Sequence, residues 1–284
     1  MIGVTVTSSP IGSLTIDNLL ERGVPAERII ALVQDPDSES AVADKGVATR
    51  RVDYNEAATV HAAIKGVEKL LFVPAPDIGK RLIEAEHVVE AAKYEGVGLL
   101  LYLSILNADT NMMALATEHV GTEQLIKENR IPHLFLRHTW YLENYTHYIP
   151  HYLKTGTMLG AAGKGRIAAA SRNDIAEAAA VLLTEDHGID RTFELAGDEP
   201  FTYQEFAEML TRLSGTTVNF EQLDPEALTD ALQDQGLSLE VASMKSDRDA
   251  GIARGDLDSV SSDLTDLIHR PSLSLREAIS RALP

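Results

Sequence analysis

Short apolar runs alternate with amphipathic stretches along the first half of the chain. In the stretch 11–22, Ile11, Leu14, Leu19 and Leu20 recur at helical spacing and predict a helix with one buried face. Strands are predicted at residues 2–7, 28–33, 50–53, 69–73, 98–103 and 133–136. Because these runs are continuous and do not alternate with polar residues, they are typical of a parallel sheet covered by helices on both faces.

This alternation of strand and helix predicts an α/β fold with a doubly wound parallel sheet, since such units form right-handed crossovers. Helices are expected to end near Gly46, Gly66 and Gly96, where glycine suits a left-handed C-cap. Ligands bind such sheets at the carboxyl ends of the strands.

The second half of the chain has a less regular pattern. It predicts strands at 166–170, 191–195 and 217–223, helices at 173–183 and 203–213, and a mainly helical, polar stretch at 225–284. We therefore expect a nucleotide-binding type of domain over residues 1–185 and a smaller α/β lobe over 186–284, with an interface between them.

Composition narrows the function classes. The chain has 43 Asp and Glu against 25 Lys and Arg, a net charge of -18 at pH 7. Without a local basic patch it repels nucleic acids and anionic membranes, so neither partner is expected. The apolar run 97–106 is too short to span a bilayer, and the N-terminus lacks signal-peptide features, so a cytoplasmic location is expected. The absence of cysteine excludes disulfides, thiolate metal sites and a cysteine nucleophile.

Seven segments carry a resemblance to a known family. They are VDYNEAATVHAAIKGVEKLLFV (52–73), LYLSILNADT (101–110), EHVGTEQLI (118–126), LRHTWYLENY (136–145), GAAGKGRIAAASRNDIAEAAA (160–180), FELAGDEPFT (193–202) and LIHRPSLSLREAI (267–279). In this order they resemble the NmrA-like family of atypical short-chain dehydrogenases, most closely its bacterial NAD(P)H:quinone oxidoreductase branch. The resemblance implies a Rossmann-type domain, NADPH as cofactor, and a small C-terminal lobe that closes over a cleft of quinone size. A homodimer is a further option.

The loop after the first strand departs from the family's glycine-rich pattern. A dinucleotide-binding turn uses glycines for a tight turn, for close approach to the pyrophosphate and for helix–strand packing. Here Val6 and Ser9 replace the first two, and Gly12 keeps the third. Ser9 is expected to cap the next helix, with Pro10 at its first position. The resemblance assigns cofactor contacts in this loop to Thr7, Ser8, Ser9, Ile11 and Gly12.

Two interpretations of this loop stay open. In one, the serine hydroxyls replace backbone donors and the helix N-terminus still holds a pyrophosphate. In the other, the chain binds no dinucleotide.

The end of the second strand bears on which cofactor binds. NADPH-using relatives have arginine where Gln34 stands, and the neighbouring Asp35 would repel a 2′-phosphate but suit a ribose hydroxyl. This favours NADH over NADPH if a dinucleotide binds, although Asp35 is equally natural as a turn residue before Pro36. After the fourth strand, the resemblance places Pro74 and Ala75 beside the cofactor.

The candidates for chemistry lie near the ends of the fifth and sixth strands. No tyrosine is followed four residues later by lysine, so the usual short-chain dehydrogenase proton relay is absent. The candidate catalytic residues are His138, Ser104 and Tyr141, and the candidate substrate contacts are Trp140, Tyr141 and Asn144. Each has a structural alternative: Ser104 as a capping residue, His138 as a buried, hydrogen-bonded histidine, and the aromatic residues as packing at the domain junction.

A metal site is not expected. His147 and His151 are four residues apart, but Pro150 lies between them and no carboxylate completes a set of ligands. The leading function is hydride transfer from NAD(P)H to a quinone or a similar small planar acceptor. The alternative is a non-catalytic sensor or regulator whose dinucleotide binding is impaired or lost.

Overall fold

The computed structural model describes residues 1–6, 9–74, 79 and 81–284. Seven parallel strands form its central sheet in the order β3-β2-β1-β4-β5-β6-β8. Their bounds are β1 Ile2–Val6, β2 Ile29–Val33, β3 Ala48–Arg51, β4 Lys69–Phe72, β5 Leu99–Ile105, β6 His133–His138 and β8 Arg191–Leu195. The strand order reverses between β1 and β4, as in doubly wound sheets that bind ligands at this point. The predicted fold class is confirmed.

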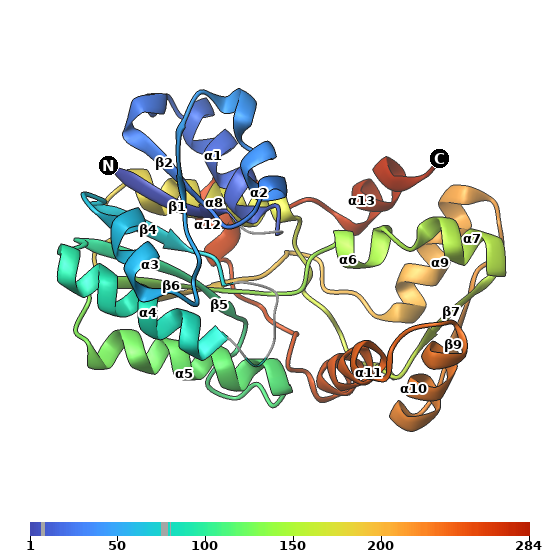
Figure 1. Cartoon of the computed structure of the whole chain (residues 1–284). Helices are drawn as coiled ribbons and strands as arrows, with labels where there is room; N and C mark the ends of the chain where they lie inside the picture. Colours follow the sequence, from blue (N-terminus) through green and yellow to red (C-terminus); the bar gives the residue numbers. More distant parts are fainter. Residues whose placement is uncertain (7–8, 75–78, 80) are drawn as a thin grey trace.

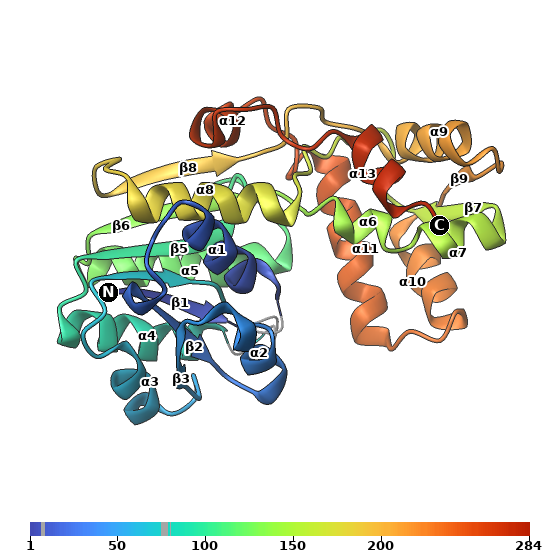
Figure 2. The same ribbon diagram turned by 90° about the horizontal axis from the view of Figure 1, so that it is seen from above.

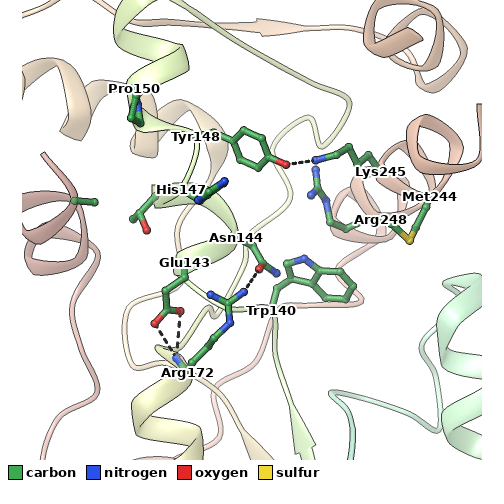
Figure 3. A pocket seen from close by; sticks show the side chains of 12 residues that line it. Trp140, Glu143, Asn144, His147, Tyr148, Pro150, Arg172, Met244, Lys245 and Arg248 are labelled. Carbon is green, nitrogen blue, oxygen red and sulfur yellow. Dashed lines mark hydrogen bonds between the residues drawn. The ribbon is translucent and has the colours of Figure 1, made fainter. Parts of the chain in front are cut away.

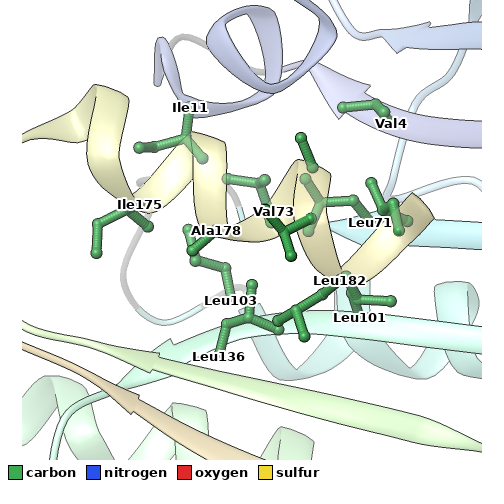
Figure 4. Packing of buried hydrophobic residues seen from close by; sticks show 14 of the residues in the cluster. Val4, Ile11, Leu71, Val73, Leu101, Leu103, Leu136, Ile175, Ala178 and Leu182 are labelled. Carbon is green, nitrogen blue, oxygen red and sulfur yellow. The ribbon is translucent and has the colours of Figure 1, made fainter. Parts of the chain in front are cut away.

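Helices cover both faces of the sheet (Figures 1 and 2). One face carries α1 (Ile11–Glu21), α8 (Arg172–Thr184) and α12 (Asp263–Ile268), and the other carries α3 (Ala57–Ile64), α4 (Arg81–Glu95) and α5 (Ala114–Glu128). Figure 4 shows the first of these layers, where Ile11, Ile175 and Leu182 pack over side chains from the central strands. Because every strand but β3 and β8 is almost fully buried, the apolar runs are continuous, as the sequence indicated.

A smaller lobe lies beyond the carboxyl ends of the strands (Figure 2). It contains a parallel pair of strands, β7 (Thr157–Gly160) and β9 (Asn219–Gln222). Its helices are α6 (Glu143–Thr146), α7 (Ile149–Thr155), α9 (Tyr203–Ser214), α10 (Pro225–Asp234), α11 (Leu239–Arg254) and α13 (Leu275–Ala282). Short elements in the first half complete the described chain: η1 (Ala26–Arg28), α2 (Pro36–Ser40) and η2 (Ala43–Lys45).

The structure corrects the expected division of the chain at residue 185. Strand β8, which follows that position, belongs to the large sheet, whereas β7, which precedes it, pairs with β9 in the small lobe. The chain thus crosses between the lobes more than once. Local sequence pattern does not reveal this exchange, because the pattern of a strand does not identify the sheet it joins.

Other local predictions are confirmed, with two corrections. Gly46, Gly66 and Gly96 all have positive φ at or just after helix ends. The predicted strand at 166–170 is wrong: this stretch makes only two isolated bridges, Ile167 to Phe201 and Tyr141 to Ala170. The helix predicted at 11–22 is α1, Ile11–Glu21, but Pro10 and not Ser9 occupies its N-cap position.

Candidate functional site

A cleft of about 190 Å³ opens at the carboxyl ends of the central strands. We call it the strand-end cleft, and its lining residues are Ser9, Val73, Pro74, Arg81, Leu103, Ile105, Leu115, His119, His138, Trp140, Tyr141 and Asn144. Strands β4, β5 and β6 supply its floor, and the segment after β6 carries it to the small lobe. The cleft brings together six predicted site residues, namely Ser9, Pro74, His138, Trp140, Tyr141 and Asn144. Gly12 lies in the first turn of α1, close to Ser9 in the chain.

His138 and Tyr141 form a stacked pair in this cleft. Their ring centroids are 4.8 Å apart and their planes differ by 9°. The His138 Nδ1 atom lies 2.5 Å from the Thr139 carbonyl oxygen, which only accepts, so Nδ1 carries the proton. The Tyr141 hydroxyl, 3.3 Å from Nε2, is then the donor to the ring.

The surroundings of this pair hold both groups neutral. Burial lowers the pKa of His138 from its ordinary 6.5 to about 4, and the Arg81 cation acts in the same direction. Burial likewise raises the pKa of Tyr141, against a smaller opposing effect of Arg172. Near neutral pH, His138 is therefore an acceptor at Nε2 and Tyr141 keeps its proton.

A second histidine in the cleft was not predicted as a site residue. Arg81 Nη1 lies 3.2 Å from His119 Nε2, and because arginine only donates, the His119 proton is on Nδ1, 2.9 Å from the Tyr102 hydroxyl. Burial and the Arg81 charge hold the pKa of His119 well below its usual range. Neither His119 nor Arg81 was among the site residues predicted from the sequence. The sequence offered one indication of His119: it stands three and four residues before Thr122 and Glu123, which places all three on one face of a helix.

Ser104 does not face the cleft, which corrects its place among the catalytic candidates. Its side chain is fully buried, and its hydroxyl donates to Glu123 Oε1 at 2.6 Å. The same carboxylate receives two hydrogen bonds from Arg137, from Nε at 2.9 Å and from Nη2 at 2.7 Å. Ser104 thus completes the hydrogen bonding of a buried ion pair beneath the strand ends.

The first turn of α1 retains the close packing expected of a dinucleotide-binding unit. A Cβ at Gly12 would lie 2.2 Å from the Thr5 carbonyl oxygen, so only glycine fits where this helix crosses β1. Val6 is accommodated as the last, fully buried residue of β1, paired with Val33. Thr7, Ser8 and Ala75 lie outside the described residues.

At the end of β2, Asp35 caps α2. Its Oδ1 accepts from the Ser38 backbone at 2.8 Å, and the Ser38 hydroxyl accepts in turn from the Asp35 backbone at 3.0 Å. These bonds lower the pKa of Asp35, so the carboxylate is charged. Gln34 is exposed beside it. Both interpretations of Asp35 remain compatible with this geometry, since capping uses one carboxylate oxygen.

A larger cavity of about 730 Å³ adjoins the cleft, and we call it the outer cavity (Figure 3). It shares Trp140 and Asn144 with the strand-end cleft. Its other lining residues are Glu143, Thr146, His147, Tyr148, Pro150, Arg172, Met244, Lys245, Arg248 and Ala282. Because these come from α6, α7, α8, α11 and α13, the cavity forms only where the two lobes meet.

Within the part of the chain that the structure describes, no group of three or more His, Cys, Asp or Glu side chains could hold a metal ion. The described helices also include none long and apolar enough to cross a bilayer.

Comparison with known proteins matches this geometry to a family. Residues 8–186 match the model of the NAD(P)H-binding family. Quinone oxidoreductase 2 of Escherichia coli is 38% identical over 280 residues, which are 99% of this chain and 98% of that protein. An NmrA-like oxidoreductase of Aspergillus flavus is 27% identical over 73% of this chain and 70% of its own.

Solved structures agree. The E. coli NADPH-dependent quinone oxidoreductase in complex with NADPH superimposes with a TM-score of 0.96 at 37% identity, covering 99% of both chains. The Citrobacter triphenylmethane reductase in complex with NADP(H) gives 0.94 at 31% identity, covering 100% of both chains. These relatives are oxidoreductases and lend no support to the non-catalytic alternative. The chain belongs to the NAD(P)H-binding family and, within it, to the NmrA-like group.

Proposed function

We propose that the protein is an NAD(P)H-dependent oxidoreductase that delivers a hydride to a quinone or a similar planar acceptor. The observation that carries this proposal is the strand-end cleft. It lies at the switch point of a doubly wound sheet, and its walls combine apolar side chains with an ordered tyrosine hydroxyl. The chain is 38% identical to a quinone oxidoreductase over nearly its full length, which supports the same class of acceptor.

The residues present fit a dinucleotide. Gly12 allows the close helix–strand approach that places the N-terminus of α1 beside the cleft, and the positive end of a helix dipole favours phosphate. Ser9 and Pro74 both line the cleft, and Ile11 begins the helix. When bound, the cofactor would supply the hydride.

The remaining chemistry belongs to the side chains. Val73, Leu103 and Ile105 provide flat apolar walls that exclude water from an aromatic ring. Tyr141 keeps its proton at Oη, and His138 Nε2 accepts it in the absence of substrate. Rotation of the hydroxyl about its C–O bond turns this same proton from Nε2 to a developing oxyanion on the acceptor. His138 is neutral near pH 7 and does not act as an acid, so solvent supplies the proton that completes quinol formation.

We also propose that NADH is preferred over NADPH. The ionised Asp35 carboxylate stands at the end of β2 beside uncharged Gln34. A 2′-phosphate would meet negative charge there, whereas a ribose 2′-hydroxyl could donate to the free carboxylate oxygen.

A cytoplasmic location and a homodimeric assembly remain predictions from the sequence.

The test is titration of NADH and NADPH into the purified protein by calorimetry, followed by quinone-reduction assays. Micromolar binding of NADH with turnover of a quinone is the expected result. The absence of binding of either nucleotide up to millimolar concentrations would overturn the proposal.

A further inference from the structure

Two cations of the outer cavity have no carboxylate partner among the residues that the structure describes. The Arg172 Nη2 atom donates to the Asn144 side-chain oxygen at 2.8 Å, and Lys245 Nζ donates to the Tyr148 hydroxyl at 3.0 Å. Neither side chain takes part in a salt bridge with any residue that the structure describes. In a chain with 43 acidic residues against 25 basic ones, two such cations on one cavity are a notable local excess of positive charge.

The other charges around the cavity cancel only part of this excess. Arg248 is paired with the neighbouring Asp249 at 2.7 Å, so it contributes little net charge. Both oxygens of Glu143 lie close to the Arg172 backbone nitrogen, at 3.1 and 3.2 Å, which directs this carboxylate to the N-terminus of α8. Figure 3 shows Arg172 and Lys245 entering the cavity from opposite lobes, with Asn144 and Trp140 between them.

The position of these cations relates them to the acceptor. Trp140 and Asn144 border both the strand-end cleft and the outer cavity, so a ring seated in the cleft has its outer edge at Trp140. A substituent on that edge would extend into the space between Arg172 and Lys245. Both side chains are half-buried, where a charge-assisted hydrogen bond is stronger than at an open surface.

We propose that the acceptor is an aromatic compound with an anionic substituent, a sulfonate or carboxylate, which Arg172 and Lys245 bind in the outer cavity. This inference rests on the proposed function for the identity of the site as an acceptor site. Binding itself, however, does not depend on turnover and is measured separately.

The chain offers a direct binding signal, because Trp140 is its only tryptophan and borders the cavity. The probes are anthraquinone-2-sulfonate and the neutral 2-(hydroxymethyl)anthraquinone, which share a ring system and differ in charge. Quenching of Trp140 fluorescence gives the dissociation constant of each. We expect the wild type to bind the sulfonate at least about tenfold more tightly than the neutral compound.

Three variants test the assignment to these residues. Arg172→Gln with Lys245→Gln is expected to reduce this preference to about twofold or less. Lys245→Gln alone is expected to lower the preference for the sulfonate about threefold or more. This single variant is needed because Arg172 also lies 4.9 Å from the centre of the Tyr141 ring, a contact that the double variant removes as well. Lys154→Gln removes an exposed lysine that lines neither cavity and is expected to leave the preference unchanged.

Equal binding of the two probes by the wild type, or an unchanged preference in the double variant, would overturn the inference. So would displacement of the sulfonate by saturating NADH or NADPH, because the cations would then belong to the cofactor site. A protein that prefers the sulfonate but reduces neither quinone with either nucleotide would instead contradict the proposed function and leave the anion site standing.

Discussion

The phenol ring of Tyr141 lies flat on the imidazole of His138, with ring centroids 4.8 Å apart and the Tyr141 hydroxyl 3.3 Å from His138 Nε2. Both residues belong to one short segment at the end of β6, yet the stack faces a cleft that also receives Arg81 from α4 and His119 from α5. In this arrangement His138 is neutral and Tyr141 is protonated near pH 7, and both protonation states can be tested.

Protonation of His138 is expected to lower the stability of the folded protein at acidic pH. Burial lowers the pKa of His138 to about 4 in the folded protein, from the ordinary value of 6.5 that applies to the unfolded chain. Between these two pH values the unfolded chain binds more protons, so the free energy of unfolding decreases as the pH falls. The loss approaches about 1.4 kcal/mol per pH unit for one histidine. His138→Asn is expected to flatten the plot of unfolding temperature against pH from 6.5 to 4, with His119 responsible for part of the remaining slope. An equal flattening with exposed His147→Asn would contradict the assignment to His138.

Tyr141→Phe tests the hydroxyl as a donor to the acceptor oxygen. Because the ring and its stacking are kept, only one hydrogen bond is lost, and kcat/KM for a neutral quinone is expected to fall by about threefold to tenfold. Nucleotide affinity, measured in parallel, should change by less than about twofold. A variant with full activity would show that the hydroxyl serves only to orient His138.

Ser104→Ala separates catalytic from structural roles on β5. Its hydroxyl donates to Glu123 and does not reach the cleft, so we expect kcat/KM within about twofold of wild type and a loss of about 1–2 kcal/mol in the free energy of unfolding. Urea denaturation and steady-state kinetics on the same preparation provide both values. A hundredfold loss of kcat in a protein of normal stability would restore Ser104 to the catalytic candidates.

Gly12→Ala tests the packing of α1 on β1. The added Cβ would lie 2.2 Å from the Thr5 carbonyl oxygen, and backbone must shift to relieve the contact, so a loss of about 1–3 kcal/mol and weaker nucleotide binding are expected. Gly98→Ala is the matched control, since its Cβ meets the Glu68 carbonyl oxygen only at 3.4 Å. Equal unfolding midpoints for the two variants would contradict this account of Gly12.

The nucleotide preference is expected to respond to the end of β2. Gln34→Arg with Asp35→Ser exchanges a negative site for a positive one, while serine still caps α2. The ratio of NADPH to NADH affinity should rise at least about tenfold, as measured by calorimetry. Asp35→Ser alone should raise it less. An unchanged ratio in the double variant would place recognition of the 2′-phosphate elsewhere.

Much of the fold could be read from local pattern. The strands at 28–33, 69–73 and 98–103 were predictable because a buried parallel strand must be apolar on both faces. Gly12 was also predictable, because a dinucleotide-binding loop brings the following helix close to the first strand. A side chain at Gly12 would meet the Thr5 carbonyl oxygen. Trp140, Tyr141 and Asn144 were placed in the cleft because they follow the carboxyl end of a central strand.

The sequence by itself thus determined the layers, the sheet and the edge at which a ligand binds, because these depend on hydrophobic periodicity and on glycine sterics. Only the tertiary structure decided which polar groups meet. It directed Ser104 to Glu123 beneath the cleft, brought Arg81 to His119 from another helix, and aligned Arg172 with Lys245 across the junction of the lobes. Such meetings depend on how distant segments pack, and hydrogen-bond partners far apart in the chain leave no periodic signal in the sequence.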